Sequence, residues 1–223
     1  MAHRTNQSSH PRPLAIFSDF DGTISHPDTL NFLAETFSSL EFRRGIGRQI
    51  ASGEISLRDG IQQEVNAIQG TLEEVLSLLR EHVQIDNAFP AFASWCQQAG
   101  IPLTILSAGI KDVIENLLRP YNLSQVRILA NALRIAEGKW SLQFLDDTPW
   151  GHDKSRAVHQ AKTEGYWAVF LGDGLSDRRA AEMADLVFAK SGLAHYCTEQ
   201  QIPHKLFTSF AEVQQELMRS FAG

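Results

Sequence analysis

The stretch that most constrains this chain runs from Leu14 to Thr23 and reads LAIFSDFDGT. Its apolar first residues predict a strand that is buried on both faces, as in a parallel sheet. Asp19 and Asp21 come directly after this strand, and Gly22 suits a tight turn. Neighbouring carboxylates repel and raise each other's pKa, so the pair is costly unless a cation or a reaction uses both groups. A turn with surface aspartates is the simpler alternative.

The composition is that of an ordinary globular protein. Of the 223 residues, 43% are hydrophobic and 21% are charged, and the formal net charge is −6. A mildly acidic chain without a basic stripe argues against a nucleic-acid partner. The sequence has no run of about 18 apolar residues, so we expect no membrane span. Cys96 and Cys197 are too few for a disulfide framework, which favours a reducing, cytoplasmic setting.

The polar start of the chain, residues 1–13, is interpreted as a disordered tail, because it lacks the apolar segment of a secretory signal. It is basic and free of acidic residues, so a short organellar address is the alternative.

The periodicity from about Asp28 to His82 is helical. Apolar residues recur at helical spacing from Leu30 to Ile68, and Ser56 and Thr71 are N-cap signals. Nothing in this region is typical of a strand. We therefore predict a small all-helical insert over residues 27–87, with the core formed by residues 14–26 and 88–223.

The rest of the chain alternates between strand-like and helix-like segments, which predicts parallel βαβ units in a Rossmann-like three-layer core. The predicted strands are 102–106, 126–135, 140–144, 167–171 and 186–189. The second and third of these predict a hairpin. The predicted helices are 89–99, 110–118, 153–162, 177–184 and 211–219. In such folds ligands bind outside the carboxyl ends of the strands.

Polar groups follow several of these strands. Beyond Asp19 and Asp21, Ser107 follows one strand, and Asp173 and Asp177 follow another. Taken singly, Ser107 is explained as a turn or N-cap serine, and Asp177 as a helix cap. Taken together, the Ser107 hydroxyl and the following N–H groups would bind an anion. The carboxylates, with the backbone at Asp21, would supply oxygen ligands for Mg²⁺.

Lys154 falls in the first turn of a predicted helix, where the helix dipole slightly disfavours a cation. A solvated lysine is one explanation and a phosphate contact is the other. Together, Lys154 and the aspartates indicate phosphoryl transfer through an aspartyl-phosphate, because a carboxylate can be the nucleophile. A lysine, Mg²⁺ and N–H donors offset the charge that opposes such an attack. A second carboxylate would act as the general acid and base.

These residues, in this order, resemble the four motifs of the haloacid dehalogenase superfamily of phosphatases: DFDGT at 19–23, Ser107, Lys154 and GDGLSD at 172–177. The resemblance implies a nucleophile at Asp19 and a general acid and base at Asp21. Dehalogenases of this superfamily that attack carbon lack the second aspartate, so its presence favours phosphate esters. The phosphate-binding residues implied are Thr23, Ser107, Ala108 and Lys154. The implied Mg²⁺ ligands are Asp19, the Asp21 backbone carbonyl, Asp173 and Asp177.

The insert resembles the small C1-type cap of the phosphoserine phosphatase-like branch, which closes over the site and reads the leaving group. Within that branch the chain is similar to the methionine-salvage phosphatases. The similarity lies in DGTI at 21–24 followed by Asp28, in ISLRDG at 55–60, and in the late hairpin. It implies 2-hydroxy-3-keto-5-methylthiopentenyl-1-phosphate as a substrate.

This chain departs from both groups. Phosphoserine phosphatases have a cap arginine that pairs with the substrate carboxylate. Counting without gaps puts Gln62 at that position, and a neutral amide cannot supply the same charge-assisted hydrogen bond. Arg58, one helical turn earlier, could take the place of the arginine. Salvage enzymes can carry a cysteine cluster before the motif lysine, where this chain has DDTPWGHD at 146–153.

Asp28 corresponds to a substrate-facing acid of the phosphoserine branch, with a helix N-cap as the alternative. Further candidates for substrate contact, each with a solvated surface as the alternative, are His26, Arg43, Arg44 and Arg48.

The resulting hypothesis is a Mg²⁺-dependent hydrolase of a small phosphorylated metabolite, as a monomer or homodimer with no nucleic-acid or membrane partner. The alternatives are a phosphoserine phosphatase-like enzyme, a phosphotransferase with an alcohol acceptor, and a non-catalytic phosphate-binding regulator. A pure binder has no need for the acid and base carboxylate at Asp21, which argues against the last.

Overall fold

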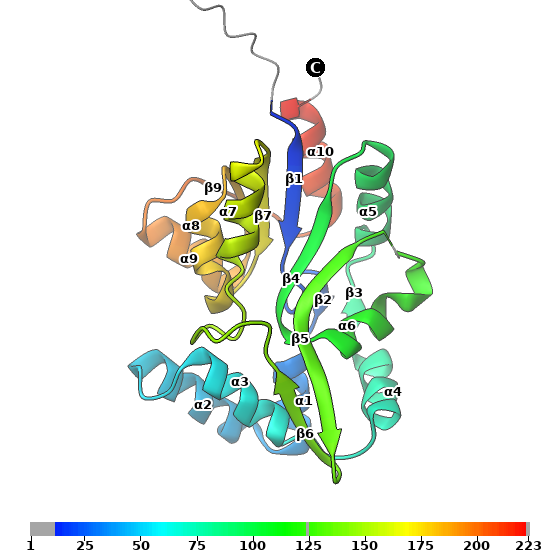
Figure 1. Ribbon diagram of the computed structural model, residues 1–223, viewed down its shortest axis with the longest axis vertical. Helices are drawn as coiled ribbons and strands as arrows, with labels where there is room; N and C mark the ends of the chain where they lie inside the picture. Colours follow the sequence, from blue (N-terminus) through cyan, green and yellow to red (C-terminus); the bar gives the residue numbers. More distant parts are fainter. Residues whose placement is uncertain (1–11, 124, 222–223) are drawn as a thin grey trace, which may run out of the picture.

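A seven-stranded sheet with the order β6-β5-β4-β1-β7-β8-β9 forms the centre of the structure (Figure 1). The computed structural model describes residues 12–123 and 125–221. The strands are β1 (Leu14–Ser18), β4 (Leu103–Ile110), β5 (Arg127–Ala136), β6 (Lys139–Gln143), β7 (Trp167–Gly172), β8 (Leu186–Ala189) and β9 (His204–Leu206). Neighbours pair in parallel, except that β5 and β6 form the predicted antiparallel hairpin. The predicted parallel sheet is therefore confirmed.

β1 lies in the middle of this sheet because every one of its residues is apolar or small and buried. It pairs with β4 over Ile16–Ser18 and with β7 over Leu14–Ser18. Side chains of a strand alternate between the two faces. Leu14 and Ile16 join one hydrophobic cluster, whereas Ala15 and Phe17 join the other. The carboxyl end of β1 therefore reaches the middle of the sheet edge.

Helices cover both faces of the sheet, which confirms the three layers. One face carries α5 (Phe89–Gln98), α6 (Lys111–Leu118) and α10 (Phe210–Phe221). The other face carries α7 (Ser155–Thr163), α8 (Arg178–Met183) and α9 (Ser191–Glu199). Two short 3-10 helices are η1 (Arg119–Tyr121) and η2 (Leu175–Asp177). Within the described residues no helix is long and apolar enough to cross a membrane.

Residues between β1 and α5 form helices, and a short pair of strands brackets them. The helices are α1 (Thr29–Phe37), α2 (Leu40–Ser52), α3 (Leu57–Asn66) and α4 (Leu72–His82). Side chains of Asp28, Ser39, Ser56 and Thr71 cap them. β2 (Ser25–His26) pairs antiparallel with β3 (Gln84–Ile85). The insert expected to be all-helical over residues 27–87 therefore also contains a short strand, Gln84–Ile85.

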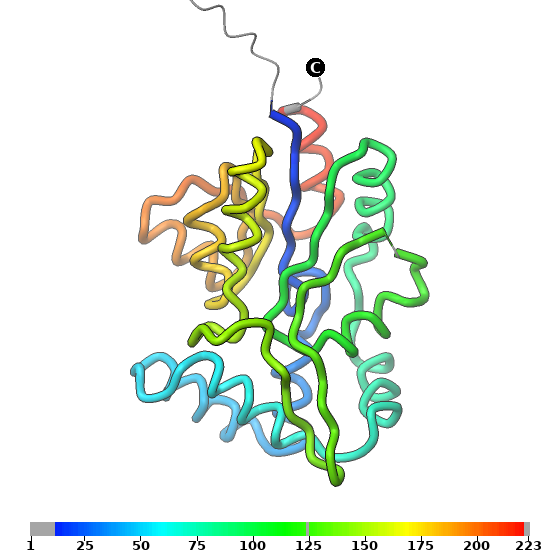
Figure 2. The backbone as a smooth tube through the Cα atoms, viewed as in Figure 1, coloured from blue at the N-terminus to red at the C-terminus, as the bar shows by residue number. Residues whose placement is uncertain are grey.

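The first three of these helices pack on one another beyond the carboxyl ends of the central strands (Figure 2). α3 also contacts β6 of the hairpin, and α4 packs on the core helix α6. The insert is therefore attached to the core both through β2 and β3 and through the hairpin. This arrangement puts α1, α2 and α3 opposite the strand ends.

Several element boundaries differ from the predictions. The strand expected to end at residue 106 continues through Ser107 to Ile110, with a shift in its register against β5. Lys154 stands at the N-cap position of α7 rather than in its first turn. Helix α9 and strand β9 were not predicted, because residues 190–210 show no clear apolar period.

Most of the predicted tail lies outside the described residues, but its last two residues are held against the core. The guanidinium of Arg12 pairs with Asp185 at 3.1 Å and lies over the Trp167 ring. The Pro13 carbonyl accepts a hydrogen bond from the Trp167 backbone.

Candidate active site

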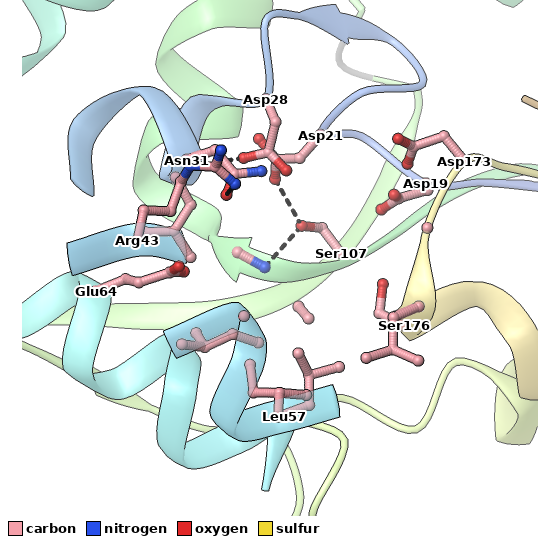
Figure 3. A pocket seen from close by; sticks show the side chains of 18 residues that line it. Asp19, Asp21, Asp28, Asn31, Arg43, Leu57, Glu64, Ser107, Asp173 and Ser176 are labelled. Carbon is pink, nitrogen blue, oxygen red and sulfur yellow. Dashed lines mark hydrogen bonds between the residues drawn. The ribbon is translucent and has the colours of Figure 1, made fainter. Parts of the chain in front are cut away.

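The ends of β1, β4 and β7 bring the predicted polar residues to one place. Asp19 follows β1, and its backbone N–H donates to the Leu171 carbonyl of β7 at 2.8 Å. Ser107 comes from β4, and Asp173 comes directly after β7. Their side chains face a shared space in the close view (Figure 3). Parallel strands deliver their carboxyl ends to one edge, so residues far apart in the sequence meet there.

Lys154 is the buried cation of this site. Its Nζ donates to Asp19 Oδ1 at 2.6 Å, to Asp177 Oδ1 at 2.7 Å and to Ser176 Oγ at 3.0 Å. The side chain is only 1% exposed, and a buried charge is tolerated only when it is well paired. Burial opposes the charged form, but Asp177 and Asp19 outweigh it and raise the pKa of Lys154. The ammonium therefore stays charged beside the Asp19 carboxylate.

Asp177 shapes the loop after β7 as well as pairing with the lysine. Its Oδ2 accepts hydrogen bonds from the backbone N–H groups of Asp173 at 2.9 Å and Gly174 at 3.0 Å. A Cβ on Gly172 would lie 2.6 Å from the Asp177 carboxyl carbon, so only glycine allows this close approach. The GDGLSD sequence thus folds into a loop that fixes the position of Asp173.

Gly22 is required for a similar reason on the other side of the site. Its φ is +78°, and a Cβ there would lie 2.3 Å from an oxygen of Asp173. Glycine adopts this backbone conformation at little cost and leaves room for the carboxylate.

The carboxylates of Asp19, Asp173 and Asp177 form a group that fits a divalent cation. Each offers an oxygen, and these oxygens lie within 4.8 Å of one another. Burial, reinforced by the Asp177 charge, raises the pKa of Asp19 well above its usual range despite Lys154. The same two causes raise the pKa of Asp173 to about 7. An all-oxygen set with this excess of negative charge matches what Mg²⁺ prefers.

Asp21 is bound by a residue that the sequence interpretation missed. Its Oδ1 accepts from both the backbone N–H, at 3.0 Å, and the hydroxyl of Thr29, the first residue of α1. Its Oδ2 accepts from the Ser107 hydroxyl at 3.3 Å. Burial raises the pKa of Asp21, and the Thr29 hydrogen bonds oppose this. The first helix of the insert thus positions the second aspartate of the motif.

The backbone around Ser107 is fixed by two further buried residues that were not predicted. The Nδ1 of His152 lies 3.0 Å from the Ser107 carbonyl, and the Asn131 side chain donates to the Ala108 carbonyl at 2.7 Å. A carbonyl only accepts, so His152 carries its proton on Nδ1. Burial lowers the pKa of His152, which keeps the ring neutral. Both residues are distant in sequence, so no local pattern indicates them.

A cavity of about 290 Å³ begins at these strand ends and continues toward the insert. Asp19, Asp21, Ser107, Ala108 and Asp173 line its core end. Polar residues at the insert end are Asp28, Asn31, Arg43 and Glu64, and the apolar ones are Leu30, Ile50, Leu57 and Ile61. Thr23 does not line it, although its buried Oγ1 has no hydrogen-bond partner among the described residues.

Of the expected insert residues, Asp28 lines the cavity while Arg58 and Gln62 do not. Asp28 also caps α1, because its Oδ1 accepts the Asn31 backbone N–H at 2.8 Å, so the N-cap is confirmed and contact with a substrate stays a prediction. The Arg58 guanidinium donates to the Asp146 carbonyl at 2.6 Å, and Gln62 accepts the Leu142 backbone N–H at 3.2 Å. Both side chains therefore join α3 to the hairpin and its following loop.

The face of α3 toward the cavity follows helical spacing. Leu57, Ile61 and Glu64 lie three or four residues apart and share one face. This period was the signal that could have identified Glu64, which ungapped counting missed. Among the other candidates Arg43 lines the cavity, whereas His26, Arg44 and Arg48 are exposed and do not.

The family follows from a comparison with known proteins. The family model for haloacid dehalogenase-like hydrolases matches residues 16–182. The chain belongs to this family. The prediction of a hydrolase of this superfamily is confirmed.

Relatives of similar length match nearly the whole chain. Pdp3-interacting factor 1 of Schizosaccharomyces pombe is 32% identical over 94% of this chain and 97% of its own length. The polyol phosphate phosphatase PYP1 of Saccharomyces cerevisiae is 29% identical, over 93% of this chain and 94% of that protein. The 2-hydroxy-3-keto-5-methylthiopentenyl-1-phosphate phosphatase of Brevibacillus brevis is 27% identical, over 91% and 94%.

A solved structure confirms the fold. A phosphoserine phosphatase, captured as an analogue of its phospho-aspartyl intermediate, superposes with a TM-score of 0.69. It is 16% identical, and the match covers 94% of this chain and 99% of that chain. The predicted haloacid dehalogenase-like fold is therefore present.

Proposed function

We propose that this protein is a Mg²⁺-dependent phosphomonoester hydrolase that works through an aspartyl-phosphate on Asp19. The observation that carries the proposal is the buried contact of Asp19 with Lys154, at 2.6 Å, beside a second aspartate held by Thr29 and Ser107. A nucleophilic carboxylate and a separate acid and base are the groups that this chemistry needs. The two relatives that are named as phosphatases, from Saccharomyces cerevisiae and Brevibacillus brevis, support it.

In the first step the Asp19 carboxylate attacks the phosphorus of the ester. The bond between phosphorus and the alcohol oxygen breaks, and Asp21 gives its proton to that oxygen. Lys154 lies 2.6 Å from Asp19 and offsets the negative charge that gathers there. The Ser107 hydroxyl and the Ala108 backbone would hold the phosphoryl oxygens, since both residues line the core end of the cavity.

In the second step water attacks the phosphorus of the aspartyl-phosphate, and Asp21 accepts the water's proton. The bond between phosphorus and the Asp19 oxygen breaks, which releases inorganic phosphate and restores both carboxyl groups. The Thr29 hydroxyl and N–H keep Asp21 in place during both steps. An acid that gives a proton and then recovers one returns the site to its starting state.

The residues that would hold Mg²⁺ are Asp19, the Asp21 backbone carbonyl, Asp173 and Asp177. The ion would supply positive charge against the phosphate and the clustered carboxylates. Asp177 already binds Lys154 and two backbone N–H groups, so Asp19 and Asp173 have more free oxygen capacity.

The substrate we propose is a small phosphorylated metabolite, because the cavity holds about 290 Å³. Similarity to the Brevibacillus enzyme supports 2-hydroxy-3-keto-5-methylthiopentenyl-1-phosphate as the substrate. Similarity to the Saccharomyces cerevisiae enzyme supports a polyol phosphate. Phosphoserine is disfavoured, because Arg58 and Gln62 contact the hairpin side instead of the cavity.

Release of phosphate from p-nitrophenyl phosphate tests the proposal. Turnover with Mg²⁺, its loss with a chelator, and its abolition by Asp19→Asn are expected, with an unchanged circular dichroism spectrum for the variant. Wild-type turnover by Asp19→Asn would refute the assignment of the nucleophile. Glycerol added as an acceptor distinguishes hydrolysis from transfer, since hydrolysis yields inorganic phosphate alone. No turnover of any ester would favour a binding protein.

A further inference from the structure

The insert end of the cavity contains two acids whose role the proposed chemistry leaves open. Asp28 precedes α1 and Glu64 lies on α3, and both line the cavity beyond the catalytic aspartates (Figure 3). One oxygen of Asp28 accepts the Asn31 N–H, which leaves the other for a ligand. Across the described residues, the Glu64 carboxyl group forms no hydrogen bond or ion pair, and only the Glu64 backbone carbonyl accepts one, from Ala67.

Arg43 is the one cation among the described residues that line this cavity, and its charge is already in use. Its Nε pairs with Glu35, and its Nη1 donates to Asn31 Oδ1 at 3.4 Å. A leaving group with a carboxylate would lose its water in this cavity, where only this already paired arginine could balance its charge. Burying an unbalanced charge in that way is costly.

A leaving group with an ammonium is disfavoured by the same arginine. The Arg43 guanidinium lies close enough to Glu64 to lower the pKa of that acid against the larger effect of burial. A second cation in the same small cavity would be repelled by it. A neutral group avoids both penalties.

The raised pKa values of Asp28 and Glu64 suit hydrogen bonding to the hydroxyl groups of a leaving alcohol. Burial, and then the charge of Asp21, raises the pKa of Asp28 to about 8. Burial raises the pKa of Glu64 to about 7 despite Arg43. Carboxyl groups that hold a proton near neutral pH both donate and accept hydrogen bonds, as an alcohol does. The apolar residues Leu30, Ile50 and Leu57 offer contacts for a carbon chain.

We propose that Asp28 and Glu64 are specificity-determining residues, which select a neutral, hydroxyl-bearing alcohol as the leaving group of the phosphate ester. The inference rests on the proposed phosphatase function. Linear polyol phosphates and hydroxy-keto phosphates share this chemistry. Carboxylate-bearing esters, such as phosphoserine or phosphoglycerate, and ammonium-bearing esters are rejected.

Matched phosphate esters test the selection. Glycerol 3-phosphate and 3-phosphoglycerate differ by a carboxylate in place of a hydroxymethyl group. Propyl phosphate is glycerol 3-phosphate without its two free hydroxyl groups. Phosphoethanolamine carries an ammonium where 2-hydroxyethyl phosphate carries a hydroxyl group. We expect the kcat/KM of each hydroxylated ester to exceed that of its partner by at least about tenfold, the effect of a single good hydrogen bond or of an unpaired charge. The methylthiopentenyl ester in a further arm separates the two hydroxylated classes.

Variants at Glu64 connect the selection to this residue. Glu64→Leu removes the hydrogen-bonding group, so the ratio of kcat/KM for glycerol 3-phosphate over propyl phosphate should fall about tenfold. Glu64→Gln should restore most of that ratio, because the amide also donates and accepts. Glu81→Leu is the matched control, because Glu81 is exposed on α4 and outside the cavity. Asp28→Asn keeps the helix cap and tests the second acid.

The outcomes separate this inference from the function on which it rests. Equal rates for hydroxylated and propyl esters, or a preference for 3-phosphoglycerate or phosphoethanolamine, overturn the selection while the phosphatase activity stands. An unchanged ratio in Glu64→Leu overturns the role of Glu64. No hydrolysis of any ester, including p-nitrophenyl phosphate, overturns the proposed function, and the inference then falls with it.

Discussion

The two ends of the cavity are built in different ways. At the core end, Lys154, Asp19 and Asp177 are almost inaccessible, and Lys154 binds Asp19 at 2.6 Å and Asp177 at 2.7 Å. At the insert end, Arg43 and Glu64 are half-buried, and the described residues offer the Glu64 carboxyl group no hydrogen bond. At the core end the buried cation is fully paired with Asp19 and Asp177, whereas at the insert end the Glu64 carboxyl group and one oxygen of Asp28 have unused hydrogen-bonding capacity.

This difference matches the work proposed for each end. Attack on phosphorus needs atoms that are already in place, because fixed charges and donors do not have to reorganise during the reaction. Selection of the leaving alcohol needs side chains whose hydrogen-bonding atoms are still free to bind its hydroxyl groups. Substitutions at the core end should therefore abolish turnover, whereas those at the insert end should change preference among esters.

The largest effect is expected for Lys154→Met, which leaves Asp19 and Asp177 buried without their cation. Breaking a buried ion pair in this way costs about 3 kcal/mol or more in the free energy of unfolding. Turnover of p-nitrophenyl phosphate should fall at least about a thousandfold, as after loss of a preorganised charge. Urea unfolding and steady-state kinetics measure the two effects.

Lys162→Met is the control for that substitution. Lys162 pairs with Asp185 at 3.2 Å on a part-exposed surface, so its loss should cost below about 1 kcal/mol and leave turnover unchanged. Equal destabilisation by both changes would show that the core end is no more tightly built than the surface.

Asp21→Asn should lower kcat by about a hundredfold to ten-thousandfold, the usual contribution of general acid and base catalysis. The amide keeps the size of the side chain but cannot exchange a proton with the alcohol or the water. Single-turnover assays with a good leaving group, p-nitrophenol, measure whether the aspartyl-phosphate then accumulates. A kcat that stays near the wild-type value would remove Asp21 from the proton path.

Much of the core end could be predicted because its residues follow strands. The apolar run before Asp19 predicts a buried strand, and parallel strands end at one edge, so Ser107 and Asp173 are expected near it. Lys154 was harder to place, because from the sequence alone a solvated lysine also explains it. Its three partners lie at residues 19, 176 and 177, and only the fold shows that they converge.

The insert end could not be predicted by counting along the chain. Gln62 and Glu64 are two residues apart on α3, and two residues correspond to about 200° of rotation around a helix. An error of that size exchanges the cavity face for the face toward the hairpin. The choice between Gln62 and Glu64 therefore depends on how α3 is rotated, which its contacts with β6 decide.

A smaller effect is expected for Thr29→Val, which tests whether the insert contributes to the core end. The change removes the hydroxyl that donates to Asp21 and keeps the backbone N–H that also donates. Loss of one such bond corresponds to about 1.5 kcal/mol, so kcat should fall about tenfold with little change in KM. Thr36→Val is the control, since the only partner of the Thr36 hydroxyl in the described part of the chain is the Phe32 carbonyl of the same helix. Equal kcat values for the two variants would show that the Thr29 hydroxyl of the insert does not contribute to proton transfer by Asp21.

The smallest effect concerns stability and pH at the insert end. Burial raises the pKa of Glu64 from its usual 4.5 to about 7 in the folded protein. Between these values the folded state keeps the proton and the unfolded state loses it, so the stabilising contribution is complete below 4.5 and is lost as the pH rises through 7. Glu64→Gln cannot titrate and should escape this loss.

Urea unfolding of the wild type and Glu64→Gln, measured from about pH 5 to about pH 8 without metal or substrate, gives the difference directly. The amide variant should gain about 1–2 kcal/mol relative to wild type across this range, a figure reduced for partial exposure of the side chain. Asp28 titrates in both proteins and largely cancels in the difference. Glu81→Gln should follow the wild type, because its carboxylate is exposed. Parallel curves for Glu64→Gln and the wild type would mean that solvent reaches Glu64 freely, and the contrast between the two ends would then rest on hydrogen bonding alone.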